Sequence, residues 1–306
     1  MQYLYGKSNQ VITQIELEEK MAEQDGMDAI DDIVMIQCVG SRGQDLHYCS
    51  KVCCSQAVKD ALKVLDLNPG ANITVLFRDM RTYGFMEDYY QMARDKGVNF
   101  IHCDVNTPPK VTEEDGLIRV EFFDTILGEM ISLEPNFVVL SVGIVPSQVQ
   151  ELSNFLKTPL TQDGFFLEAH PKLRPVEFSV DGIYFCGLAH SPKPIAESIA
   201  QAKAAAGKAC IPLSKGFVTA DPNVSSMSTD TCIGCGICES LCPYAAIRMV
   251  KEDIQNQAET ISASCKGCGI CASHCPTFSI SMCGFTNEQI IAQINTFGQE
   301  LVDGNS

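Results

Sequence analysis

The most constraining feature of this sequence is a cysteine pattern that occurs twice near its C-terminus. Each copy has the spacing Cys-x2-Cys-x2-Cys-x3-Cys-Pro. The eight cysteines are Cys232, Cys235, Cys238 and Cys242 in the first run, and Cys265, Cys268, Cys271 and Cys275 in the second. This spacing is typical of 4Fe–4S binding, and in proteins with two such runs the fourth cysteine of each ligates the other cluster. The sequence therefore predicts two 4Fe–4S clusters.

Crossed ligation assigns the eight cysteines to two sets. We predict that Cys232, Cys235, Cys238 and Cys275 bind one cluster, and that Cys265, Cys268, Cys271 and Cys242 bind the other. The intervening glycines allow the backbone to turn tightly around each cluster. A zinc site would favour pairs of cysteines rather than triplets, and a disulfide framework is the other alternative. Residues 225–284 are expected to form this domain, a small α+β fold of the ferredoxin type.

Composition restricts the class of protein further. The net charge of −16 argues against nucleic-acid binding. No apolar run approaches the ~20 residues of a membrane span, and the first 32 residues lack the apolar core of a signal peptide. Sixteen cysteines, eight of them assigned as cluster ligands, are typical of a reducing compartment. We therefore expect a cytoplasmic protein without a membrane span.

The rest of the chain alternates between strand-like and helix-like patterns. Residues 1–32 are expected to form an acidic helical lead-in without a core of its own. Residues 33–143 read as a Rossmann-like α/β domain with a parallel sheet. Its expected strands are 32–40, 72–78, 98–103 and 136–143, its helices 53–65 and 86–97, and a small meander at 110–133 turns at Asp115-Gly116. In residues 144–218 we expect a short strand at 182–187 and a helix at 194–211, and residues 285–306 are expected to form a C-terminal helix and tail.

Four further cysteines stand where a nucleotide-binding domain usually carries its glycine motif, between the first strand and helix. They are Cys38, Cys49, Cys53 and Cys54. A lone buried cysteine is usually a small apolar residue, whereas four within 17 residues at the edge of a sheet also suit a third 4Fe–4S cluster. The helix that begins at Cys53-Cys54 is expected to favour their thiolate forms. Spacing alone leaves both readings open.

Several longer motifs resemble the A-subunit family of heterodisulfide reductases. The resemblance rests on CVGSR followed by YCSKVCCSQAVK, on FRDMRTYGFMEDYY, LSVGIVPS, GFFLEAHPKLRPV and GIYFCGLAHSPKPIAESIAQAKAAA, and on the paired cysteine runs. It implies a thioredoxin-reductase-like flavoprotein fold followed by a two-cluster ferredoxin domain. It also implies that Cys38, Cys49, Cys53 and Cys54 bind an unusual 4Fe–4S cluster and that Lys59 lies near a flavin ring.

The resemblance covers only one half of the family's FAD domain, here residues 144–218. Gly187, Pro194, Ile195 and Ser198 match flavin-contacting positions, but no dinucleotide glycine loop precedes them. The implied FAD is then shared with a partner chain that supplies the other half of the site. The methionine at position 1 favours a natural split subunit over a fragment.

These features predict an electron-transfer subunit of a cytoplasmic oxidoreductase complex, with three 4Fe–4S clusters and a shared FAD. The resemblance implies partners such as ferredoxin or hydrogenase-linked subunits, and possible electron bifurcation at the flavin. Two alternatives remain open: a flavin-free relay of the polyferredoxin type, and a subunit that only docks its neighbours.

Overall fold

The computed structural model describes residues 3–23, 30–43, 46–217, 222–252 and 255–303. The chain divides into two compact units. The first comprises Met1–Ser147, Gln162–Phe165 and Gly187–Ala200, and the second comprises Gln148–Thr161, Phe166–Cys186 and Gln201–Ser306. Among the described residues, no helix is both long and apolar enough to cross a membrane.

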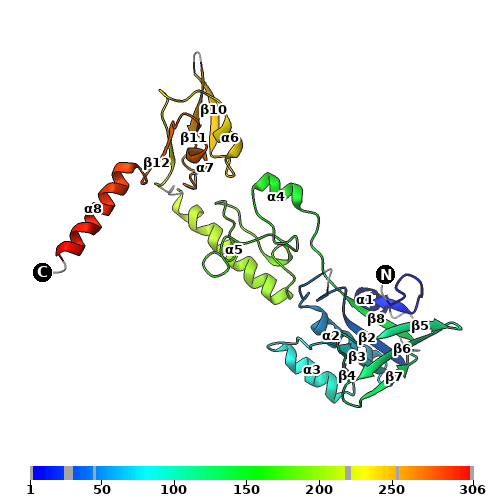
Figure 1. Ribbon diagram of the computed structural model, residues 1–306. Helices are drawn as coiled ribbons and strands as arrows, with labels where there is room; N and C mark the ends of the chain where they lie inside the picture. Colours follow the sequence, from blue (N-terminus) through cyan, green and yellow to red (C-terminus); the bar gives the residue numbers. More distant parts are fainter. Residues whose placement is uncertain (1–2, 24–29, 44–45, 218–221, 253–254, 304–306) are drawn as a thin grey trace. The chain divides into compact units, whose positions relative to one another are not determined.

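The first unit is built around a five-stranded parallel sheet (Figure 1). Its strands are β1 (Val11–Thr13), β2 (Asp32–Val39), β3 (Asn72–Phe77), β4 (Asn99–His102) and β8 (Phe137–Val142), in the order β1-β8-β2-β3-β4. Successive strands run outward from β2 to β4, and β8 lies on the other side of β2. The direction of winding therefore reverses between β2 and β8, as it does in doubly wound sheets that bind nucleotides. The predicted parallel α/β fold is confirmed.

The two faces of this sheet are covered differently. Helices α1 (Gln14–Glu23), α2 (Cys53–Leu67) and α3 (Met86–Asp95) contribute to a core on one face. An antiparallel sheet of β5 (Lys110–Glu114), β6 (Leu117–Asp124) and β7 (Glu129–Leu133) packs on the other face, where Ile118, Val120 and Phe122 are buried. Strands β5 and β6 are joined at Asp115-Gly116, whose φ angles of 51° and 81° are those of a tight hairpin turn, as predicted.

The N-terminal segment corrects one prediction. Within residues 1–32 the structure describes 3–23 and 30–32, and they belong to the α/β core rather than to a separate lead-in. Strand β1 extends the parallel sheet beside β8. Leu17 and Met21 lie one helical turn apart on α1 and are buried against the helical face of the sheet. The many acidic residues of this segment make the short apolar stripe hard to recognise in the sequence.

The second unit begins with α4 (Gln150–Leu156) and irregular backbone that packs around three phenylalanines, Phe166, Phe178 and Phe185. The short strand expected at 182–187 is absent from this described segment. Tyr184 instead makes a single isolated bridge with Glu177. Burial of Phe185 in the aromatic cluster explains the apolar pattern that suggested a strand. The long helix α5 (Ile195–Lys215) follows, as predicted, after a 3₁₀ turn at Gly187–Ala189, and the turn and the helix as far as Ala200 belong to the first unit.

The ferredoxin domain in the second unit is made of two similar halves. Its two-stranded sheets pair β9 (Ser225–Met227) with β12 (Ile280–Met282), and β10 (Ile247–Glu252) with β11 (Gln255–Thr260). Each cysteine run leads into a short helix, α6 (Ile237–Leu241) or α7 (Ile270–Ser273). The predicted C-terminal helix is present as α8 (Asn287–Asp303). The expected tail at 304–306 lies outside the described residues.

Candidate functional site

One cavity of the ferredoxin domain is lined by Cys232, Cys235, Cys238 and Cys275. Apolar side chains such as Ile237, Met249 and Ile280 complete its wall. The first three cysteines surround the start of α6, whereas the fourth follows α7. The fold therefore brings the last cysteine of the second run to the first three of the first run.

A second cavity repeats this arrangement with the roles of the runs exchanged. It is lined by Cys265, Cys268, Cys271 and Cys242. Its wall also contains Tyr244, Ile247 and Met282. Among the described residues, no three His, Cys, Asp or Glu side chains converge closely enough to hold a single metal ion. The two sets of four cysteines are those predicted for crossed ligation.

Two glycines allow the cysteine loops to pass close to neighbouring backbone. A Cβ atom on Gly234 would lie 2.2 Å from the carbonyl oxygen of Asn256, and one on Gly267 would lie 2.3 Å from that of Asn223. Both glycines also have positive φ, at 68° and 63°. Since real Cβ contacts are never this short, each loop needs glycine at this position.

Backbone amides point at three of the cysteine sulfurs. Ala246 N donates to Cys242 Sγ at 3.2 Å, Ser279 N to Cys275 Sγ at 3.3 Å, and Ser225 N to Cys265 Sγ at 3.4 Å. Burial opposes ionisation of Cys275, but hydrogen bonds from Thr277 and Ser279 outweigh it and lower the pKa of this thiol. Such donors stabilise the thiolate form that binds iron.

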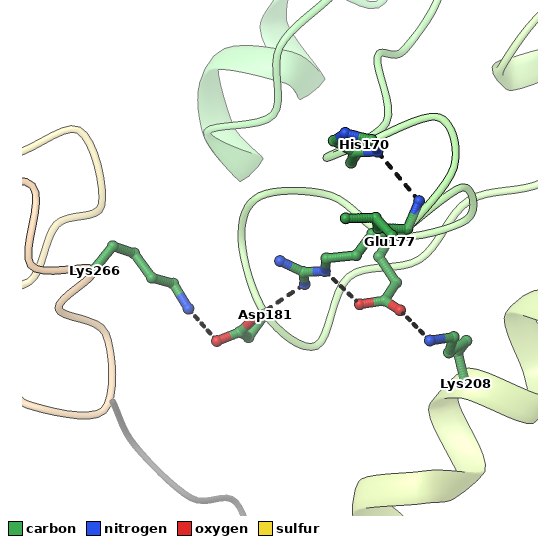
Figure 2. Close-up of polar contacts among 7 residues, drawn as sticks. His170, Glu177, Asp181, Lys208 and Lys266 are labelled. Atoms are coloured by element: carbon green, nitrogen blue, oxygen red, sulfur yellow. Dashed lines mark hydrogen bonds and ion pairs between the residues drawn. The ribbon is translucent and has the colours of Figure 1, made fainter. Parts of the chain in front are cut away.

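An ion-pair network ends at the second cysteine run. Lys266, between Cys265 and Gly267, pairs with Asp181, and Arg174 Nη2 lies 3.3 Å from the same carboxylate (Figure 2). Glu177 in turn accepts hydrogen bonds from Arg174 Nε at 2.8 Å and pairs with Lys208 of α5 at 2.9 Å (Figure 2). Burial opposes ionisation of Asp181, but Lys266 and Arg174 outweigh it and lower the pKa of Asp181. The sequence analysis did not single out these residues.

In the first unit, the four remaining candidate cysteines gather at the carboxyl end of β2. Burial, followed by the proximity of Cys54, Cys38 and Cys49, raises the pKa of Cys53 to about 12. Cys53 Sγ donates to Val142 O, and Cys54 Sγ donates to Asp79 O, both at 3.7 Å. The expected shift toward thiolate at the helix start was wrong for these free thiols, because burial outweighs the helix dipole. Binding of a metal deprotonates thiols and would offset this cost.

A β-bulge in β2 orients Cys38 toward the other three candidate cysteines of the first unit. Ile36 pairs with Leu140 and Val39 pairs with Val142, so β2 has one residue more than β8 between these pairs. Cys38 has a φ of +61°, which is uncommon for a residue other than glycine. Ile36 and Val39 both pack on the β5–β7 side of the sheet. The extra residue therefore places Cys38 away from that side, toward the start of α2.

Positive side chains surround the same cysteines. Arg42 lies near Cys38 and pairs with Asp79. Burial raises the pKa of Cys54, and Arg81 counteracts this effect through its backbone amide and its charge. Arg42 lies in the CVGSR motif and Arg81 in FRDMRTYGFMEDYY, and Arg81 also follows a parallel strand, where ligands of such sheets usually bind.

The residues matched to flavin contacts lie in two places within the first unit. Lys59 projects from α2, is 55% exposed, and pairs with Glu18 and with Asp60 at 3.2 Å. Gly187, with φ of +67°, lies against Ser198, whose backbone amide donates to Pro194 O at 3.0 Å. Ile195 is exposed. The buried Lys193 holds this turn, because its ammonium donates to Gly187 O at 2.8 Å.

A large open cavity adjoins this turn. It is lined by Lys51, Met80, Arg81, Thr82, Tyr83 and Glu197. Glu197 stands one residue before Ser198, and Arg81 lies beside Cys54. Tyr83 donates a hydrogen bond to Glu197, and burial together with this bond raises the pKa of Tyr83 to about 12. The cavity therefore lies between the four cysteines and the turn at Gly187.

Comparisons with known proteins agree with these features. Residues 225–282 match the family model of the 4Fe–4S dicluster domain. Over 276 residues the chain is 39% identical to an iron-sulfur A subunit of the CoB–CoM heterodisulfide reductase of Methanopyrus kandleri, covering 82% of this chain and 40% of that protein. It is 38% identical over 310 residues to the A subunit of the H2:CoB–CoM heterodisulfide, ferredoxin reductase of Methanothermobacter thermautotrophicus, covering 96% and 46%.

A third relative is the heterodisulfide reductase A-like protein of Archaeoglobus profundus, 41% identical over 270 residues and covering 87% of this chain and 38% of that protein. The chain thus spans less than half the length of these three relatives. Thioredoxin reductase of T. acidophilum gives a TM-score of 0.44 at 17% identity, covering 70% of this chain and 59% of that one.

Proposed function

This chain is a relative of the heterodisulfide reductase A subunits, and we propose that it transfers electrons through three 4Fe–4S clusters within an oxidoreductase complex. The observation that carries the proposal is the pair of cavities, each lined by three cysteines of one run and the fourth of the other. Two clusters bound there would each store one electron. The chain's own contribution is to bury Cys238 and Cys271, to direct amides at the sulfurs of three other cysteines and to keep both cavities largely apolar.

Crossed ligation makes a specific prediction for single cysteine variants. Cys275→Ser removes a ligand of the cluster held by Cys232, Cys235 and Cys238, although Cys275 belongs to the second run. We expect the spectrum of that cluster to change while its neighbour keeps its signal. Cys242→Ser is the matched control and should affect the cluster of Cys265, Cys268 and Cys271. Loss of the cluster that is local in sequence, in either variant, would favour ligation within each run.

We propose a third cluster on Cys38, Cys49, Cys53 and Cys54. Their convergence at the reversal of sheet winding supports it, as do the nearby cations of Arg42 and Arg81, which favour an anionic ligand set. Anaerobically reconstituted protein should then hold about twelve irons, four per cluster. The double variant Cys53→Ser, Cys54→Ser should hold about eight. A wild-type content near eight that the double variant leaves unchanged would remove the third cluster.

We further propose that an FAD is shared with a partner chain. The open cavity beside Glu197 and the turn at Gly187 support a flavin next to the four cysteines. Without a glycine loop this chain lacks the helix N-terminus that usually holds the pyrophosphate. We therefore expect the purified chain to be essentially free of flavin and to gain one FAD when co-produced with a partner that supplies the missing half. Stoichiometric FAD on the chain alone would contradict a shared site.

The finer parts of the proposal follow from the relatives. Their names describe subunits, so the chain is proposed to act with other subunits and with redox proteins such as ferredoxin, in the cytoplasm. Electron bifurcation requires the flavin. A complex that is active without flavin would favour the simpler relay, and a complex that stays active after Cys38→Ser and the cluster-ligand substitutions would favour a docking role.

In the flavin-loaded complex, Lys59→Ala should shift the flavin potential and leave the iron content intact.

A further inference from the structure

Two buried polar side chains next to the four cysteines of the first unit lack hydrogen-bond partners. Gln37 is 4% exposed, and neither its amide nitrogen nor its amide oxygen is paired within the described part of the chain. Ser141 is 0% exposed, and its hydroxyl likewise has no partner among the described residues. Buried polar groups are almost always paired, so these atoms call for an explanation.

The alternation of β2 shows which way Gln37 points. Ile33 and Met35 pack in the core shared with α1 and α2, whereas Val34 and Ile36 pack on the β5–β7 side. Gln37 continues the first set. Because the bulge returns Val39 to the β5–β7 side, Gln37 and the neighbouring Cys38 both lie on the side of α2.

The first turn of helix α2, which carries two of the cysteines, lies next to Gln37. The helix connects two adjacent parallel strands, so it runs antiparallel to them, and its first turn lies at their carboxyl ends. That first turn begins with Cys53 and Cys54. Gln37, near the end of β2, therefore faces the turn that carries these two thiols.

Ser141 approaches the same place from the neighbouring strand. Leu140 packs on the β5–β7 side and Val139 on the helical side, so Ser141 shares the helical side with Gln37. Ile36 pairs with Leu140, which makes Gln37 and Ser141 near neighbours across β2 and β8. The next residue, Val142, accepts the hydrogen bond from the Cys53 thiol. Both unpaired side chains thus adjoin the cysteines.

We propose that Gln37 and Ser141 are positioning residues for the third cluster, and that they donate hydrogen bonds from the amide nitrogen and the hydroxyl to its sulfur atoms. This inference rests on the proposed function, because it requires a cluster on the four cysteines. Sulfur atoms of such clusters accept hydrogen bonds, and these bonds stabilise the more negative, reduced form. The two side chains then raise the reduction potential of that cluster above the value that the cysteines alone would give.

The test uses the full chain, reconstituted anaerobically, in four forms. Gln37→Leu and Ser141→Ala each remove one donor at nearly constant volume. Thr74→Val is the matched control, because Thr74 is a buried polar residue of the same sheet that lines a different cavity, at the amino end. For each form, iron content, the midpoint potential of every cluster from an EPR-monitored titration, and the effect of D2O on the cluster's vibrational bands are measured.

We expect Gln37→Leu to keep the wild-type iron content and to shift one of three potentials downward. Ser141→Ala should shift the same potential downward, and Thr74→Val should shift none. The D2O effect on the bands of that cluster should be smaller in Gln37→Leu than in the wild type.

The outcomes separate this inference from the proposed function. A wild-type content of about eight irons refutes the third cluster and the inference with it. A content of about twelve irons, with unchanged potentials in both donor variants, leaves the third cluster intact and overturns the inference. If Gln37→Leu fails to fold or to retain iron, Ser141→Ala decides: a lowered potential supports the donors, and an unchanged one refutes them.

Discussion

Asp60 provides a test of the packing between α1 and α2, because its carboxyl group is fully buried. Its Oδ1 atom lies 3.2 Å from Lys59 Nζ and accepts from Gln56 Nε2 at 3.4 Å, while Oδ2 has no partner in the described part of the chain. Burial raises the pKa of Asp60 to about 7, against the opposing charge of Lys59. Keeping this group ionised at high pH therefore costs the protein stability.

The sign follows from proton binding. Between the ordinary pKa of an aspartate and pH 7 the folded state binds a proton that the unfolded state does not bind, so stability falls as pH rises through this window. Each pH unit in the window costs about 1.4 kcal/mol. Asp60→Asn removes the titration, so the gain in stability of the variant over the wild type should grow by about 2–3 kcal/mol between pH 5 and pH 8.

Hydrogen exchange of the α2 amides, compared between variant and wild type at the same pH, measures this gain. The ratio of the protection factors of these amides, variant over wild type, should be roughly 100-fold larger at pH 8 than at pH 5. This follows because 1.4 kcal/mol corresponds to a factor of ten. Asp66→Asn is the control, because Asp66 lies on the same helix but is exposed and paired with Lys96. A gain that does not change with pH, or a loss of protection in Asp60→Asn at pH 8, would show that Lys59 keeps Asp60 ionised without cost.

Three further predictions test other parts of the structure. Leu17→Ala should destabilise the first unit by about 3–5 kcal/mol, because Leu17 is fully buried. Unchanged hydrogen exchange of the β2 and β8 amides in this variant would show that α1 does not support the sheet. Gly234→Ala should abolish binding of the cluster held by Cys232, Cys235 and Cys238, since its Cβ would meet backbone, whereas Gly216→Ala, at a positive φ with nothing within 4 Å and outside both cysteine cavities, should keep the cluster with a loss of stability of about 1–2 kcal/mol; equal iron contents in the two variants would contradict this. Asp181→Asn leaves the charge of Lys266 without its carboxylate partner, so the potential of the cluster next to Lys266 should rise, and an unchanged potential would show that solvent screens the pair.

Local sequence patterns were sufficient to predict much of the fold. The spacing of the cysteine runs identified the ferredoxin domain, which the dicluster family model also matches. The apolar runs of β2, β3 and β8 predicted buried parallel strands, since such strands are apolar on both faces. Asp115-Gly116 predicted its hairpin because few other dipeptides adopt two positive φ angles easily. Each of these signals depends on residues that are close in sequence.

The tertiary structure decided what depends on distant partners. The spacing of the two runs already predicted that Cys275 would meet the first run, and the pairing of β9 with β12 closes the fold around that meeting. The orientation of Cys38 depends on a bulge that exists only as a register difference between β2 and β8. The apolar pattern at 182–187 suggested a strand, but a strand requires an edge to pair with, and Phe185 instead packs against Phe178. The sequence therefore determined the ligand types, their spacing and the two sets in which the paired runs meet, whereas long-range strand pairing and burial determined the orientation of Cys38 and the irregular backbone at 182–187.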